Sequence, residues 1–287
     1  MDDKKRFNKI VKDIKDVKIQ GARNIAKKAL QAYKLIPTKS SKRKLLDARP
    51  TEPMMENVLD MAEETHDYKK ILNHFDEAQD KINKHVLKLI KNNDVVFTHC
   101  HSTNVINALI YAKKKGHRSV YTQRAQDPKL RSKGAKNFEV YNTETRPLFQ
   151  GRKTARQLKK AGIKVTMFVD SAVGVALSGE QGNKKPDIVF LGADALLKNG
   201  VVNKIGSETI AKLAKQENIP VYIVADSWKF TNKKVLMEGR KLDEVWHRAP
   251  KGIKLKNPAF EFVDGKYIIG IVTEFGMQKY RDFLRKV

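Results

Sequence analysis

The only cysteine of the chain, Cys100, lies between His99 and His101 at the end of the apolar run 95–98. A thiol in this position can serve as a metal ligand, a nucleophile, an acid/base group or a small packing residue. Adjacent residues at a strand end point to opposite faces and cannot all reach one ion, which disfavours a metal site. Free N–H groups of a following helix would favour the thiolate. This context alone leaves chemistry and packing equally open for Cys100.

Polar residues follow several short apolar runs beyond residue 94. These runs (DVVFTH, FEVYNT, KVTMFVD, DIVFLGAD and VYIVAD) alternate with amphipathic helical stretches, a pattern that predicts a parallel sheet covered on both faces. Ligands of such sheets bind beyond the carboxyl ends of the strands. We therefore expect one sheet edge to carry residues 99–102, residues 143–146, Asp170 with Ser171, Asp194, and Asp226 with Ser227.

The first part of the chain has a different periodicity. Apolar residues recur there at spacings of three and four, which predicts helices within 7–19, 24–36, 54–64 and 68–90. These helices are separated by Gly21, by a basic patch at 37–46 that leads into ARPTEP, and by a polar junction near His66. The segment 117–134 interrupts the later alternation and is predicted to be a short strand followed by a long exposed loop.

Composition narrows the class of protein. The 287 residues are 40% apolar and 31% charged, which is typical of a globular protein, and a single cysteine excludes an intrachain disulfide. We find neither a signal-peptide pattern nor a run approaching the roughly 18 apolar residues of a membrane span, so we expect a cytoplasmic protein. The net charge of +26 indicates an anionic partner or a lysine-rich solvated surface.

The basic residues near possible anion sites form short motifs. The sequence contains neither GxGxxG nor GxxxxGK[ST], so arginines, lysines and backbone amides would have to bind any phosphate. Candidates are IQGAR (19–23), ARPT (48–51), TETRPLFQGR (143–152), NKIGS (203–207) and Lys229. Each motif alone is weak evidence for a site.

Taken in order with THC, GAD and VADSWKF, these motifs resemble a family that covers roughly residues 15–275. This family joins ribose-1,5-bisphosphate isomerase, methylthioribose-1-phosphate isomerase and the regulatory subunits of translation initiation factor 2B. The resemblance implies an α/β protein with a helical N-terminal domain (1–92), a Rossmann-like domain (93–287) and an active site between them. It also implies a catalytic pair, Cys100 and Asp194, and substrate contacts at Gly21, Ala22, Arg49, Gln150, Asn203, Lys204 and Lys229.

The chain departs from the family pattern at three places. Gln20 stands where an arginine is usual, and Arg23 is close enough in sequence to replace it. His101 stands where asparagine is common, and the segment 117–134 is longer than usual. The first two changes affect the identity of the substrate, and the third affects assembly.

Retention of both Cys100 and Asp194 favours an enzyme, because a regulatory subunit does not need the pair. Basic residues near the motifs (Arg23, Arg49, Arg146, Lys204 and Lys229) favour a bisphosphate. We predict an aldose–ketose isomerase that converts ribose 1,5-bisphosphate to ribulose 1,5-bisphosphate. The alternatives are a non-catalytic regulatory subunit and a methylthioribose-1-phosphate isomerase.

The expected partners follow from this function. We expect a phosphorylated sugar substrate, no metal and no cofactor, and neither a membrane nor a nucleic acid as partner. The apolar stretches FEFV and YIIGIVTEFG exceed what a domain edge needs, so we also expect a homodimer or a hexamer built of dimers.

Overall fold

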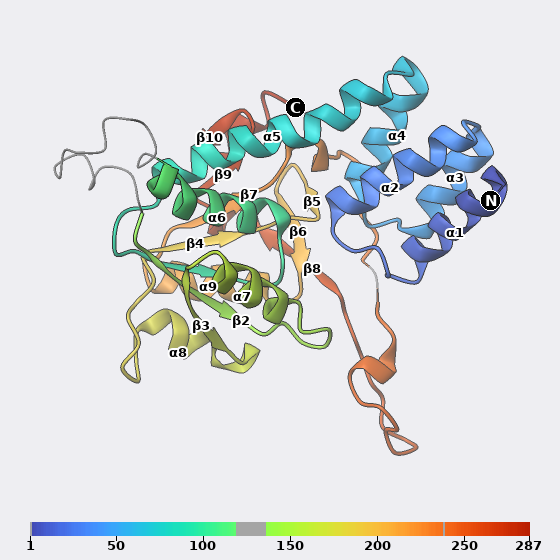
Figure 1. Cartoon of the computed structure of the whole chain (residues 1–287). Coiled ribbons are helices and arrows are strands. Elements are labelled where there is room, and N and C mark those ends of the chain that lie inside the picture. Colours follow the sequence, from blue (N-terminus) through green and yellow to red (C-terminus); the bar gives the residue numbers. More distant parts are fainter. Residues whose placement is uncertain (1, 119–135, 238) are drawn as a thin grey trace.

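The computed structural model describes residues 2–118, 136–237 and 239–287 (Figure 1). The predicted segment 117–134 begins inside a helix, and from residue 119 onward it lies outside the described residues. The first part of the chain forms five helices: α1 (Asp3–Lys15), α2 (Ala22–Leu35), α3 (Lys39–Ala48), α4 (Pro53–Thr65) and α5 (Tyr68–Leu89).

The basic patch is itself a helix, α3, and the prediction that it merely separates helices is wrong. Thr38 caps this helix, because its hydroxyl accepts a hydrogen bond from the Ser41 backbone N–H at 3.2 Å. Ser41 and Leu45 are buried on one side, while Lys42 pairs with Asp60 at 2.7 Å and also with Glu63. Only three residues of this helix are buried (Ser41, Leu45 and Ala48), which is too few to produce a clear apolar periodicity in a mostly polar sequence.

The main sheet has the strand order β10-β9-β7-β4-β1-β2-β3. Its strands are β1 (Val95–Thr98), β2 (Glu139–Thr143), β3 (Lys164–Phe168), β4 (Ile188–Leu191), β7 (Val221–Val224), β9 (Gly270–Thr273) and β10 (Gly276–Gln278). All neighbouring pairs are parallel except β9 with β10. The predicted α/β class, with helices before a mostly parallel sheet, is confirmed.

Alternate residues of the strands pack into two separate clusters, one on each face of the sheet. On one face, Phe97 and Leu191 pack with Ile210 of α9 (Ser207–Gln216). On the other face, Val96 and Phe190 belong to a cluster with residues of α5 and α6 (Thr103–Arg118). The central strands β1 and β4 are therefore buried on both faces, as expected for strands of a parallel sheet that is covered on both faces.

Helix α5 contacts both parts of the protein. Its residue Phe75 packs with the N-terminal helices, whereas Ile82 and Val86 pack on the sheet (Figure 1). The domain boundary near residue 92 stays a prediction. The second half of α5 comes before this boundary in the sequence but packs on the sheet that comes after it.

A second, antiparallel sheet was not predicted. It consists of β5 (Ala195–Leu196), β6 (Gly200–Lys204) and β8 (Phe260–Asp264) in the order β5-β6-β8. Its last strand contains FEFV, and β9 contains much of YIIGIVTEFG, so several of these apolar residues are buried within one chain. Ile269, Phe275 and Met277 remain exposed. β5 has only two residues and directly follows the GAD turn, and so short a run has no periodicity that distinguishes a strand from a loop.

The remaining helices lie between the strands or after the last one. They comprise α7 (Gln150–Lys160), α8 (Val173–Ser178), α10 (Tyr280–Phe283), and the 3-10 helices η1 (Asp170–Ala172), η2 (Ser227–Lys229), η3 (Leu242–Glu244) and η4 (Gly265–Tyr267). None of the helices in the described residues is both long enough and apolar enough to span a membrane.

Candidate active site

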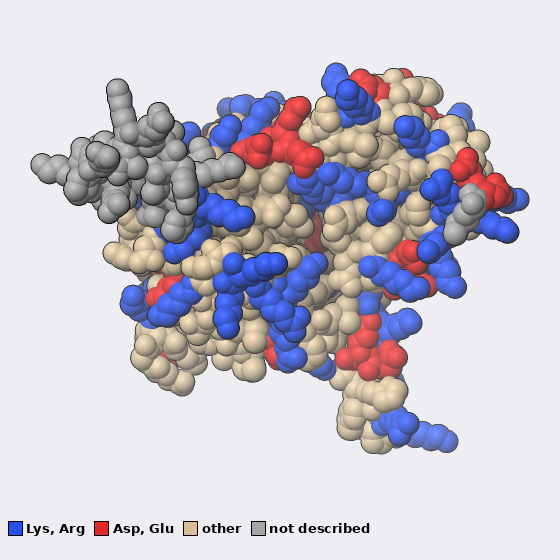
Figure 2. Space-filling model, viewed as in Figure 1, with Lys and Arg blue, Asp and Glu red and all other residues tan. Residues whose placement is uncertain are grey.

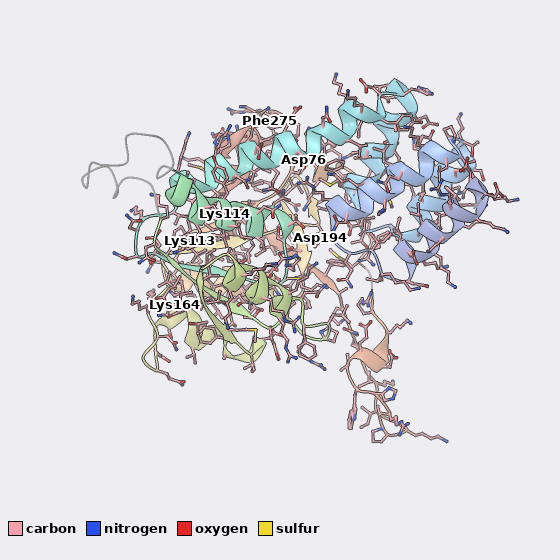
Figure 3. All side chains as sticks on the ribbon, in the orientation of Figure 1. Asp76, Lys113, Lys114, Lys164, Asp194 and Phe275 are labelled. Atoms are coloured by element: carbon pink, nitrogen blue, oxygen red, sulfur yellow. The ribbon has the colours of Figure 1, made fainter. Side chains whose placement is uncertain are left out.

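A cavity lies where the carboxyl ends of β1 and β4 face the N-terminus of α2. Figure 3 marks Asp194 at this junction, and Figure 2 shows basic side chains on both sides of the hollow near the middle of the view. Ten of the eleven predicted site residues line the cavity: Gly21, Ala22, Arg23, Arg49, Cys100, Gln150, Asp194, Asn203, Lys204 and Lys229. The topology therefore gathers motifs that are as much as 200 residues apart in sequence.

Arg146 is the predicted site residue that the structure leaves outside the cavity. Its guanidinium donates a hydrogen bond to the Val245 carbonyl oxygen at 3.1 Å and lies 5.0 Å from the Phe149 ring centroid. Its backbone N–H donates to the Asp170 carboxylate at 2.6 Å. These contacts indicate that Arg146 stabilises the loop that follows β2.

Cys100 has a left-handed backbone with φ of 63°. Its N–H donates to Thr145 Oγ1 at 3.0 Å, and its carbonyl oxygen accepts from Thr154 Oγ1 at 2.7 Å. Thr145 and Phe149 nearby also have positive φ. Such conformations cost about 1–3 kcal/mol each and cluster at functional sites, because the surrounding contacts must hold them. The connection that carries Cys100 is therefore fixed by two hydroxyl groups.

Burial raises the pKa of the Cys100 thiol to about 11, and the charges of Asp194 and Asp170 act in the same direction. The charge of Lys204 lowers this pKa, but it does not overcome the cost of removing a thiolate from water. Cys100 is a thiol in the free site at neutral pH. The expectation that the helix end favours the thiolate is not supported, because desolvation is the larger effect.

Alkylation by iodoacetamide measures this pKa directly, since the chain has a single thiol. A pKa of about 11 in place of 9.0 leaves roughly 100-fold less thiolate below pH 9. We expect the alkylation rate of the folded protein to keep rising from pH 7 to pH 10. The urea-unfolded chain is the control and should level off near its ordinary pKa. A plateau of the folded protein at or below pH 9 would contradict the assignment.

The two histidines beside Cys100 contact different elements. His99 is buried, with Nε2 at 2.9 Å from the Ile205 carbonyl oxygen and Nδ1 at 2.5 Å from Thr143 Oγ1. Nδ1 of His101 lies 3.0 Å from Thr154 Oγ1. The rings therefore point to separate partners, in agreement with the spacing argument against one shared ion. Burial lowers the pKa of His99, so this ring is neutral, and its two hydrogen bonds connect β1 to the segments that contain Thr143 and Ile205.

Three predicted cations are almost fully buried: Lys229, Lys204 and Arg49 are 6%, 7% and 8% exposed. The Lys229 ammonium donates to the Ala193 carbonyl oxygen at 2.5 Å, and that of Lys204 lies 4.7 Å from the Phe260 ring centroid. Buried cations are costly unless an anion compensates them. Arg49 has such a partner in Glu52, whose Oε1 lies 3.9 Å from the Arg49 Nε. Among the described residues, six cationic side chains line the cavity but only two carboxylates do, Glu52 and Asp194, so it favours an anion of several charges.

Five charged or titratable lining residues were not predicted as site residues: Glu52, His99, His101, Lys153 and Arg240. Lys153 follows Gln150 by three residues, so the helical period could have placed both on one face. Arg240 lies in a segment without periodicity, where the sequence carries no such signal, and its guanidinium pairs with Glu244. Arg23 likewise pairs with Asp76, which reduces the charge that it offers to a ligand.

The segment η2, which carries Lys229, is held by three side chains. Asp226 Oδ1 accepts from the Trp228 backbone N–H at 3.0 Å and lies 3.2 Å from His74 Nε2. Glu274 accepts from the Ser227 N–H at 3.1 Å, and the Trp228 and His74 rings stack at 3.4 Å. Atoms of His74, Asp226 and Glu274 that can coordinate a metal ion lie within 4.8 Å of one another. The hydrogen bonds that Asp226 and Glu274 make to η2 explain how Lys229 is positioned.

The chain is similar to several known proteins. The ribose 1,5-bisphosphate isomerase of Methanocaldococcus jannaschii is 33% identical, over 92% of this chain and 88% of that protein. The 5-deoxyribose 1-phosphate isomerase of Petrotoga mobilis is 36% identical, over 76% of this chain and 62% of that protein. The solved structure of the Pyrococcus horikoshii OT3 translation initiation factor eIF-2B has a TM-score of 0.77 at 24% identity and covers 97% of this chain and 98% of that one.

The match to a family model extends over nearly the whole chain. Residues 18–280 match the model described as the initiation factor 2 subunit family. This range contains the N-terminal helices from α2 onward, both sheets and every residue that lines the cavity except Val17. The chain therefore belongs to the initiation factor 2 subunit family.

Proposed function

We propose that this chain, a sugar-phosphate isomerase of its family, converts ribose 1,5-bisphosphate to ribulose 1,5-bisphosphate. The observation that carries the proposal is the cavity whose lining contains Cys100 and Asp194 together with the buried Lys204 and Lys229. The relative from Methanocaldococcus jannaschii, whose name states this activity, is 33% identical and supports the same substrate.

The two acid/base groups have distinct tasks in this reaction. A sugar with phosphate on its anomeric carbon does not open its ring spontaneously, so a group must donate a proton to the ring oxygen. We assign this donation to Asp194 in its protonated form, and the transfer of the proton from C2 to C1 to Cys100 as a thiolate. Because Cys100 is a thiol in the free site, its proton must pass to the Asp194 carboxylate within the bound complex, which leaves the thiolate and the acid that the reaction needs. Lys204, whose charge lowers the pKa of Cys100, favours the loss of the thiol proton.

The charge of the cavity supports a bisphosphate over a sugar with a thiomethyl group. Arg49, Lys204 and Lys229 are buried, and Lys153 adds a cation at the start of α7. The apolar residues of the lining are Val17, Ala22, Leu148, Ala193 and Phe260, and the Phe260 ring lies against the cations of Arg49 and Lys204. Each phosphate of a bisphosphate would gain cationic partners here.

One assay tests the substrate. The purified protein is incubated separately with ribose 1,5-bisphosphate, methylthioribose 1-phosphate and 5-deoxyribose 1-phosphate, and ketose formation is followed. We expect the highest kcat/KM with the bisphosphate, and the Lys229→Met variant should lower it more for the bisphosphate than for the other two sugars. Faster turnover of either monophosphate would replace the proposed substrate. Absence of turnover with all three would favour the regulatory subunit.

We also propose that the protein assembles into a homodimer or a hexamer through the segment between β7 and β8, which extends away from the body in Figure 1. Leu242, Trp246 and Ile253 are exposed there by 49%, 48% and 49%. Exposed apolar side chains of this size are typical of an interface. Light scattering should show an oligomer at micromolar concentration, and Trp246→Glu should reduce its mass.

A matched control is Met167→Glu, because Met167 is 45% exposed but lies on the edge strand β3. We expect this variant to keep the parent mass. A monomeric parent protein would refute the assembly, and dissociation by Met167→Glu instead of Trp246→Glu would place the interface elsewhere.

A further inference from the structure

We propose that His101 is a specificity-determining residue whose Nε2 atom accepts a hydrogen bond from a hydroxyl group of the bound sugar. The proposal rests on the sugar-phosphate substrate proposed above and concerns the orientation of that substrate. His101 is half-buried in the lining of the cavity and directly follows Cys100.

The hydrogen bonds around Thr154 fix the tautomer of His101. Thr154 Oγ1 lies 2.7 Å from the Cys100 carbonyl oxygen and 3.0 Å from His101 Nδ1. A carbonyl oxygen can only accept, so the single hydroxyl proton of Thr154 is donated to Cys100. The hydroxyl oxygen then accepts from His101 Nδ1–H. A neutral imidazole has one ring proton, so Nε2 of His101 is left as an acceptor.

His101 remains neutral in the cavity. Burial, followed by the charge of Lys153, lowers its pKa to about 4. His99 has the opposite tautomer, because the Ile205 carbonyl oxygen at 2.9 Å requires a proton on Nε2. His99 thus uses both nitrogens within the protein. Within residues 2–118, 136–237 and 239–287, the hydrogen bond of the His101 ring is the one at Nδ1, which leaves Nε2 for a ligand.

An unprotonated nitrogen distinguishes hydroxyl groups from phosphates. Phosphate oxygens are acceptors at neutral pH and repel a second acceptor, whereas a sugar hydroxyl can donate to it. Gln150 adds another acceptor, since its Oε1 is buried and makes no hydrogen bond within the described part of the chain. His101, before α6, and Gln150, the first residue of α7, therefore face the hydroxyl groups, and the buried Lys204 and Lys229 are left to bind phosphate.

Two variants of His101 separate its two nitrogens. Glutamine can place an amide oxygen near the position of Nε2, whereas asparagine reaches only the position of Nδ1 and loses the acceptor in the cavity. Calorimetric titration in a Cys100→Ser background, which limits turnover, measures affinity for ribose 1,5-bisphosphate. The second ligand is 1,5-pentanediol bisphosphate, which has both phosphates and no ring hydroxyl.

We expect His101→Asn to weaken ribose 1,5-bisphosphate on the order of 10-fold relative to the pentanediol ligand. His101→Gln should retain most of the preference for the sugar. Equal weakening of both ligands, or equal effects of both variants, would show that His101 acts only on the structure of the site and would overturn the proposal.

The tautomer is measured separately in the free protein by ¹⁵N spectra of labelled histidine, with His101→Asn for assignment. We expect a proton on Nδ1 and none on Nε2, and Thr154→Val should release this preference. A proton on Nε2 of the parent would overturn the proposal. Because this result needs no substrate, it stands apart from a failure of the proposed function, which would be seen as absent turnover of ribose 1,5-bisphosphate.

Discussion

Replacing Cys100 with serine is expected to lower kcat for ribose 1,5-bisphosphate by about 100- to 10,000-fold, the usual contribution of an acid/base group. A serine hydroxyl has nearly the size of the thiol but a far higher pKa, so it would not take up and release the C2 proton at neutral pH. The thiol lies in the cavity with Asp194, and Lys204 is the cation that acts on its pKa. Steady-state kinetics measure the loss.

A packing role for Cys100 makes the opposite prediction. Serine would then leave kcat nearly unchanged and lower stability by burying a hydroxyl. Thermal unfolding of both proteins is therefore measured beside the kinetics, and the left-handed backbone with its contacts to Thr145 and Thr154 should be retained. Turnover by Cys100→Ser at the rate of the parent would exclude the acid/base role.

Asp194→Asn should cause a loss of similar size, about 100- to 10,000-fold in kcat, because an amide cannot protonate the ring oxygen. Asp194 follows β4 and leads into β5, and its backbone N–H donates to the Val202 carbonyl oxygen at 2.8 Å. That backbone hydrogen bond is unaffected by the substitution, and thermal unfolding checks that the variant keeps the fold. Values of kcat and KM are measured for both variants and for the double variant.

If the pair acts as a unit, the double variant should be little worse than the more damaged single variant. Arg49→Ala serves as the contrast, because a residue that binds phosphate in both ground and transition states should mainly raise KM. Losses that multiply in the double variant, or an unchanged kcat in Asp194→Asn, would contradict a cooperating pair.

The sequence by itself predicts the architecture and the edge on which the site lies. Alternating apolar runs and helices define a parallel sheet, and parallel strands bring their carboxyl ends to one edge. For this reason the order of residues along the chain is enough to predict that Cys100, after β1, and Asp194, after β4, lie on the same edge. The ordered motifs, from QGAR to SWKF, supply the family and most of the cavity lining.

Only the tertiary structure decides the chemical state of these residues. Cys100 is a thiol because the cavity removes it from water, and no local pattern reports desolvation. The neighbours His99 and His101 differ because their partners, Ile205 and Thr154, lie 106 and 53 residues further along the chain. Periodicity describes which face a residue occupies, but the hydrogen-bond partners and the charge of a buried group depend on segments that only folding brings together.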